Sequence, residues 1–125
     1  SVESVIEKDI ILSGDADKLE RVFDNLLRNA VNYSYPNTVI QLSMEQRKEE
    51  HKVLLRVQNH GRTIAKEKLE HIFEQFFRVD ASRSSATGGS GLGLAIARQI
   101  VEMHHGQIQA ESVDEMIVFE VELPI

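Results

Sequence analysis

The stretch Lys18-Leu-Glu-Arg-Val-Phe-Asp-Asn-Leu-Leu-Arg-Asn-Ala-Val-Asn-Tyr33 decides the fold, because two patterns run along it together. Apolar residues recur at steps of three and four, which predicts a helix with one buried face: Leu19, Val22, Phe23, Leu26 and Ala30. Asn25, Asn29 and Asn32 form a second row at the margin of that face, and Tyr33 follows one turn after Asn29. A single such asparagine is often merely solvated. Since a buried amide needs partners for its donors and its acceptor, three on one edge favour a binding site.

Length, charge and composition bound what the chain can be. Its 125 residues predict one domain, 1–125, and the absence of cysteine excludes a disulfide framework and a thiolate zinc site. The net charge of −6 argues against a nucleic-acid binder that works by neutralising phosphates. No apolar run is long enough to span a bilayer, and no signal peptide pattern opens the chain. Because it begins with Ser1 rather than Met, we expect a piece of a longer protein.

The remaining elements are predicted outward from the long helix. Apolar alternation and β-branched runs predict strands at 10–12, 39–44, 53–57, 108–112 and 117–123, and helical spacing predicts further helices at 66–73 and 91–104. The charged stretch 45–52 is predicted to be a solvated hairpin tip. Three helices are too few to cover both faces of such a sheet. We therefore expect an α/β two-layer sandwich, with one five-stranded mixed sheet and three helices on one face.

Two further stretches favour a ligand site. The polar residues 58–64 follow a predicted central strand, and Gly61 can turn the backbone there. Gly89-Ser-Gly-Leu-Gly-Leu94 opens a helix, where glycines let backbone N–H groups approach an anion. It is neither a Walker motif nor a dinucleotide fingerprint. The loop 78–90 before it is long and polar, which is typical of a functional lid or of disorder.

Taken together, four stretches resemble the sequence boxes of one family. Asn25-Leu-Leu-Arg-Asn-Ala-Val-Asn-Tyr33 is similar to the asparagine box of the catalytic, ATP-binding domain of sensor histidine kinases. Asn59-His-Gly-Arg-Thr63 stands at its first glycine box, Phe73-Glu-Gln-Phe-Phe-Arg-Val-Asp80 at its phenylalanine box, and Gly89-Ser-Gly-Leu-Gly-Leu-Ala-Ile-Ala97 at its second glycine box. Type II topoisomerases, mismatch-repair ATPases and heat-shock chaperones share this superfamily. The resemblance covers nearly the whole chain and is greatest to the vancomycin-resistance sensor kinases. It implies a Bergerat-type sandwich with a flexible ATP lid over 78–90.

The resemblance also implies roles for individual residues toward ATP and Mg²⁺. In the asparagine box, Asn29 would be the magnesium ligand and a catalytic residue, Asn25 would support it, and Tyr33 would lie against the adenine ring. Asn59 would accept a hydrogen bond from the adenine amino group, with Gly61 beside it.

The phosphates of ATP would be bound from the other two boxes. Arg78 would meet the γ-phosphate as a second catalytic residue. The second glycine box would offer its backbone through Gly89, Gly91, Leu92 and Gly93.

The chain departs from the family pattern at several places. Asn59 stands where the family has Asp, Thr63 where it has a second Gly, and Asn32 where it has Lys. The glycine-rich signature near the C-terminus is absent from 113–118. These changes predict either a weakened or a degenerate ATP site.

Three functions follow from the resemblance. The first is a histidine kinase catalytic domain that passes the γ-phosphate of ATP to a histidine on a separate phosphoacceptor domain, with a response regulator downstream. The fragment would be a monomer, and its parent a homodimeric sensor in a bacterial inner membrane with this domain in the cytoplasm. No histidine of the chain has the family's acceptor motif, whether His51, His60, His71, His104 or His105.

The second function is ATP hydrolysis, and the third is a non-catalytic interaction module of the same fold. Hydrolytic relatives use a Glu where this chain has Asn25, which cannot act as a general base, and Asp24 points elsewhere on the helix. The departures at Asn32, Asn59 and Thr63 support the interaction module.

Overall fold

The computed structural model describes residues 2–6, 16–74 and 93–124. Its elements, in chain order, are β1 (Val2–Ile6), α1 (Ala16–Tyr33), β2 (Ile40–Arg47), the 3-10 turn η1 (Lys48–Glu50), β3 (Lys52–His60), α2 (Lys66–Leu69), α3 (Gly93–Met103), β4 (Gln107–Val113) and β5 (Met116–Pro124). Within these ranges, no helix combines the length and the apolar character that a membrane crossing requires.

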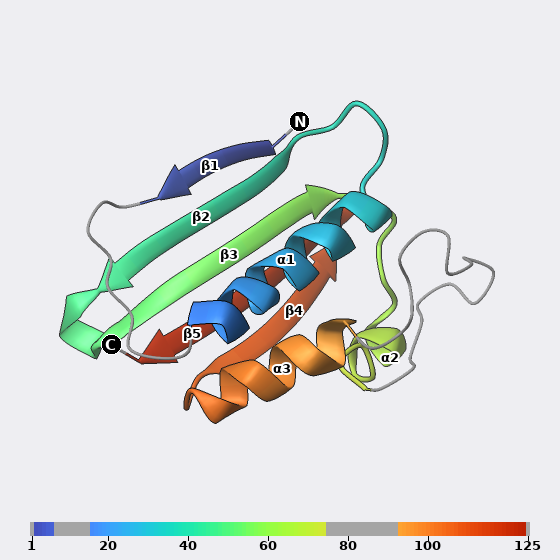
Figure 1. The fold of residues 1–125 in the computed structure, drawn as a ribbon. Coiled ribbons are helices and arrows are strands. Elements are labelled where there is room, and N and C mark those ends of the chain that lie inside the picture. Colours follow the sequence, from blue (N-terminus) through green and yellow to red (C-terminus); the bar gives the residue numbers. More distant parts are fainter. Residues whose placement is uncertain (1, 7–15, 75–92, 125) are drawn as a thin grey trace.

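The strands form one mixed sheet in the order β1-β2-β3-β5-β4 (Figure 1). Neighbours among β2, β3, β5 and β4 pair antiparallel, and β1 pairs in parallel with β2 at the edge. α1 and α3 lie side by side over one face of the sheet, while the short α2 contacts β4 at one end. The predicted α/β architecture, in which helices cover a β-sheet, is confirmed.

The core lies between the two layers. The predicted apolar face of α1 is confirmed, since Leu19, Val22, Leu26 and Ala30 are all buried and Phe23 packs against them. Every second residue of β5 is buried as well, with Phe119 fully enclosed at the centre. The ring of Phe73 meets that of Phe119 edge to face at 6.0 Å. Phe73 is therefore a core residue; Phe76 and Phe77 lie outside the described residues.

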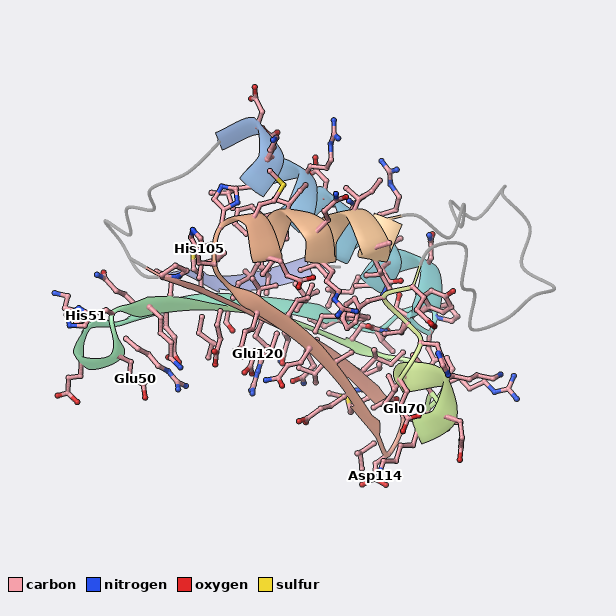
Figure 2. All side chains as sticks on the ribbon, turned by 90° about the horizontal axis from the view of Figure 1, so that it is seen from below. Glu50, His51, Glu70, His105, Asp114 and Glu120 are labelled. Carbon is pink, nitrogen blue, oxygen red and sulfur yellow. The ribbon has the colours of Figure 1, made fainter. Side chains whose placement is uncertain are left out.

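The opposite face of the sheet is polar. Figure 2 shows the side chain of Glu120 pointing away from the helices. It forms an ion pair with Arg56 at 3.0 Å, and Lys52 pairs with Glu122 at 3.4 Å. The face of β5 that carries Glu120 and Glu122 is thus the side of the strand turned toward solvent. Ion pairs that water can reach, as these can, contribute little to stability individually.

Several predicted boundaries were wrong, and for β2 and β3 the reason is that pairing with neighbouring strands extends them. β3 continues to His60, so residues 58–60 belong to a strand that pairs with β5, not to a turn after it. β2 continues to Arg47, which shortens the predicted hairpin tip. The helix predicted at 66–73 ends at Leu69. The strand predicted at 10–12 and the lid predicted at 78–90 lie outside the described residues, and the described first strand is β1 instead.

Candidate functional site

The predicted site residues gather at one end of the molecule, where α1 and β3 end and α3 begins (Figure 1). Asn25, Asn29 and Tyr33 come from α1, and Asn59 comes from β3. Two glycines complete the described set: Gly61 just after β3 and Gly93 at the start of α3. The other predicted site residues lie outside the described ranges: Arg78, Gly89, Gly91 and Leu92.

Asn59 is a buried polar residue without a partner. It is 1% exposed and lies two residues after the core residue Val57 on the same strand, so its side chain is on the helix-covered face. Neither its Oδ1 nor its Nδ2 makes a hydrogen bond with any described residue. Leaving such a group unsatisfied costs about 1–3 kcal/mol. A polar ligand that completes this amide would recover that free energy.

Gly61 joins Asn59 to the end of α1. A Cβ atom added at Gly61 would lie 2.2 Å from the Tyr33 carbonyl oxygen, 3.0 Å from Asn59 Nδ2 and 3.2 Å from Ile117 Cδ1. The backbone after β3 therefore touches the last turn of α1, and only glycine permits this approach. The structure thus brings the first glycine box and the asparagine box together.

Asn25 joins α1 to the start of α3. A Cβ on Gly93 would lie 3.5 Å from Asn25 Oδ1, so the second glycine box enters its helix directly beside the asparagine box. The Nδ2 of Asn25 is buried and makes no hydrogen bond within the described part of the chain. Asn29 follows one turn later on α1 and is half-buried. An amide with an unfilled hydrogen-bond donor therefore lies one turn before the predicted magnesium ligand on the same helix.

Hydrogen bonds hold residues 61–64 to the β4–β5 turn. Gly61 N donates to the Glu115 carbonyl at 3.0 Å, Glu115 N donates to Thr63 Oγ1 at 2.8 Å, and Ile64 N donates to Ser112 Oγ at 2.9 Å. We call these three bonds the Thr63 strap. The sequence prediction treated Thr63 only as a departure from the family and missed Ser112 and Glu115. The signal for this contact was weak, because the residues at a two-residue hairpin turn do not reveal what packs against them.

Tyr35 ties the same turn to the end of α1. Its backbone N–H donates to the His60 carbonyl at 2.7 Å, and its hydroxyl donates to Glu115 Oε1 at 3.3 Å. Partial burial raises the pKa of Tyr35, and the negative charge of Glu115 adds to the increase. The hydroxyl therefore keeps its proton, and can donate to Glu115, at higher pH than an ordinary tyrosine. Sequence analysis did not single out this residue.

Comparisons with known proteins match almost the whole chain. The family model of the histidine kinase-, DNA gyrase B-, and HSP90-like ATPases matches residues 14–125. The sensor protein VanSC of Enterococcus gallinarum is 45% identical over 119 residues, which are 95% of this chain and 32% of that protein. The sensor protein VanS of Enterococcus faecium is 50% identical over 117 residues, 94% of this chain and 30% of that protein. The chain thus spans about a third of these relatives.

Solved structures show the same fold. The nucleotide-free catalytic domain of the histidine kinase ThkA superposes with a TM-score of 0.82 at 31% identity, covering 98% of this chain and 78% of that one. The mycobacterial sensor histidine kinase MprB superposes with a TM-score of 0.84 at 28% identity, covering 98% of this chain and 82% of that one.

Proposed function

The chain belongs to the family of histidine kinase-, DNA gyrase B-, and HSP90-like ATPases, and we propose that it is the catalytic module of a two-component sensor kinase. In this proposal it binds ATP with Mg²⁺ and transfers the γ-phosphate to a histidine on a separate phosphoacceptor domain. That histidine would then supply a response regulator. The parent would be a membrane-anchored sensor kinase of the vancomycin-resistance type, with this module in the cytoplasm.

The observation that supports nucleotide binding is a set of buried amide atoms without a hydrogen-bond partner: Nδ2 of the half-buried Asn25, and both Oδ1 and Nδ2 of the fully buried Asn59. Asn25 lies on α1 and Asn59 on β3. Gly61 brings the end of β3 against the last turn of α1, and Gly93 brings the start of α3 beside Asn25. Buried polar groups in folded proteins are nearly always hydrogen-bonded. Amides left open on two neighbouring elements are therefore best explained by a polar ligand that binds between them.

The chain's own residues suit a nucleotide that carries a metal ion. Asn29 would hold Mg²⁺ through its amide oxygen, a neutral ligand that adds no negative charge opposite a triphosphate. When bound, the ion would neutralise charge on the phosphates during transfer. Tyr33, at the end of α1, offers its ring to the base, and Asn59 offers its amide to the edge of the base.

The proposed transfer needs no general base from this chain. A nitrogen of the acceptor histidine attacks the γ-phosphorus in line, while the bond from that phosphorus to the bridging oxygen breaks and ADP leaves with the electron pair. The chain positions the triphosphate for this attack. Hydrolysis would instead require a residue that activates water. Asn25 occupies that place on α1, and the adjacent Asp24 is exposed to solvent.

Calorimetric titration with ATP, with and without Mg²⁺, tests the proposal. We expect the wild-type chain to bind ATP more tightly with Mg²⁺ than without. Asn29→Ala should lose that difference, with a fall of about 10-fold or more in affinity at saturating Mg²⁺, because metal ligands and their supports typically contribute on this scale. Asp24→Ala, on the exposed side of the same helix, is the matched control and should bind like wild type.

Two outcomes would contradict the proposal in different ways. Unchanged magnesium dependence in Asn29→Ala, in a chain that still unfolds cooperatively, would show that the metal assignment is wrong. No heat at millimolar ATP with any variant would instead favour the non-catalytic interaction module.

A further inference from the structure

We propose that Asn59 lets the nucleotide site accept either an amino group or an oxygen at position 6 of the purine ring. The chain would then bind a 6-oxo purine nucleotide as well as ATP. The inference rests on the proposed function, since it assumes that a purine nucleotide occupies the site. Its basis is the state of one side chain rather than the family resemblance: Asn59 is buried, carries both a donor and an acceptor, and has neither one committed.

The amide of Asn59 is free to present either end. No described residue bonds its Oδ1 or its Nδ2, so no hydrogen bond within that part of the chain selects one orientation of the amide over the other. Gln58, the preceding residue of β3, shows the contrast. On the opposite face of the sheet, its Nε2 donates to Gln41 Oε1 at 3.3 Å, so that amide cannot turn over unless its partner does as well. The two ends of an amide are nearly equal in size, so turning it about the Cβ–Cγ bond leaves its packing unchanged.

The hydrogen-bonding edges of adenine and of a 6-oxo purine have donor and acceptor exchanged. Turning over the Asn59 amide exchanges its donor and acceptor in the same way. Adenine presents a donor at its 6-amino group and an acceptor at N1. A 6-oxo purine presents an acceptor at O6 and a donor at N1. An amide can accept from the 6-amino group while donating to N1, or, turned over, donate to O6 while accepting from N1–H. Both pairings use two hydrogen bonds and leave neither end of Asn59 unsatisfied.

A carboxylate at this position could not do the same. An ionised Asp only accepts hydrogen bonds, so it would pair with a 6-amino group and repel an O6 placed at the same point. Sites that hydrogen-bond a substrate group discriminate strongly against analogues that leave a buried group unpaired. The N–H donor of the Asn59 amide is therefore the group that would reduce discrimination between 6-amino and 6-oxo purines.

Binding of inosine 5′-triphosphate, measured by calorimetry beside ATP at saturating Mg²⁺, tests the inference. This nucleotide is the decisive probe because it has the 6-oxo edge without the 2-amino group of guanine. We expect the wild-type chain to bind the two nucleotides with affinities within about 10-fold of each other. Asn59→Asp should shift the ratio of affinities by about 10-fold or more toward ATP.

Gln58→Glu is the matched control, because it makes the same amide-to-acid change at the next residue on the opposite face. We expect it to leave the ratio unchanged. Cooperative thermal unfolding shows whether Asn59→Asp is folded. If it is not, the ratio of the wild-type affinities for ATP and inosine triphosphate still tests the inference.

The outcomes separate this inference from the proposed function. If ATP binds and inosine triphosphate binds more than about 10-fold more weakly, the inference is wrong while the proposed function stands. If Gln58→Glu shifts the ratio as much as Asn59→Asp does, added charge rather than the lost donor is responsible, and the inference is again overturned. If neither nucleotide binds, the proposed function itself fails.

Discussion

At the scale of single residues, Gly61 matters because backbone, not a flexible side chain, fills the space where a Cβ would lie. The Tyr33 carbonyl oxygen is 2.2 Å from that point. We expect Gly61→Ala to lower the free energy of unfolding by about 1–3 kcal/mol, because the loop after β3 must move away from α1. Since Asn59 Nδ2 is only 3.0 Å from the same point, ATP affinity should fall as well. Urea denaturation and calorimetry measure the two effects.

Gly93→Ala is the control for that substitution. The nearest atom to a Cβ on Gly93 is Asn25 Oδ1 at 3.5 Å, an ordinary contact distance. Alanine is also the better helix former, so this variant should be as stable as wild type to within about 1 kcal/mol. Equal losses of stability in the two variants would show that the contact between Gly61 and Tyr33 is not what constrains the loop.

At the scale of elements, the Thr63 strap joins the segment after β3 to the β4–β5 hairpin. Thr63→Val keeps the shape of the side chain but leaves the Glu115 N–H without its acceptor. Because the site is exposed, water can replace part of the bond, and we expect a loss of about 0.5–1 kcal/mol in unfolding free energy. Amide hydrogen exchange at Glu115 should become faster. The hydroxyl of Thr63→Ser should restore slow exchange; equally fast exchange in both variants would exclude the hydroxyl as the acceptor.

The strap also explains why a threonine is compatible with this fold. The hydroxyl satisfies a backbone donor at a turn whose residues, Asp114 and Glu115, both have positive φ. Such a tight two-residue turn directs its N–H groups in fixed directions. In Figure 2, Asp114 and His51 lie at the two opposite ends of the sheet, and α2 lies at the same end as Asp114. The segment that carries Gly61 is therefore bonded to the β4–β5 hairpin and also packed against α1.

At the scale of the whole molecule, stability depends on one core between the sheet and the two helices. Phe119 is fully buried in that core and packs against Phe73. Phe119→Ala should lower the unfolding free energy by about 3–5 kcal/mol, through lost burial and the cavity left behind. A domain of this size is stabilised by only about 5–15 kcal/mol, so the variant should be close to unfolding.

Urea denaturation of Phe119→Ala beside Val31→Ala measures this effect. Val31 lies on α1 with 58% of its surface exposed, and its truncation should change stability by less than about 0.5 kcal/mol. Similar losses in both variants would mean that the core is not packed as described.

The elements were predicted more reliably than their ends. The helix from Ala16 to Tyr33 and the strands around Val57 and Phe119 follow from local spacing, because a buried face must repeat with the period of its own element. The position at which β3 ends could not be predicted from local spacing, which placed it at residue 57 instead of residue 60. Polar residues 58–60 resemble a turn, and they stay in the sheet because all three pair with β5 and Gln58 also pairs with Gln41 of β2. The roles predicted for Asn29 and Tyr33 toward a nucleotide stay predictions.

The amino-acid sequence by itself determined which face of the long helix is buried and the layered α/β architecture, because both follow from the spacing of residues close together in the chain. The candidate residues of the site came from the resemblance of four separate boxes to one family, and their roles stay predictions. Tertiary structure alone decided that Asn59 is left without a partner in the described residues, that Gly61 touches Tyr33, and that Thr63 bonds Glu115. These features depend on hydrogen bonds and contacts between segments far apart in the chain, which no local pattern encodes.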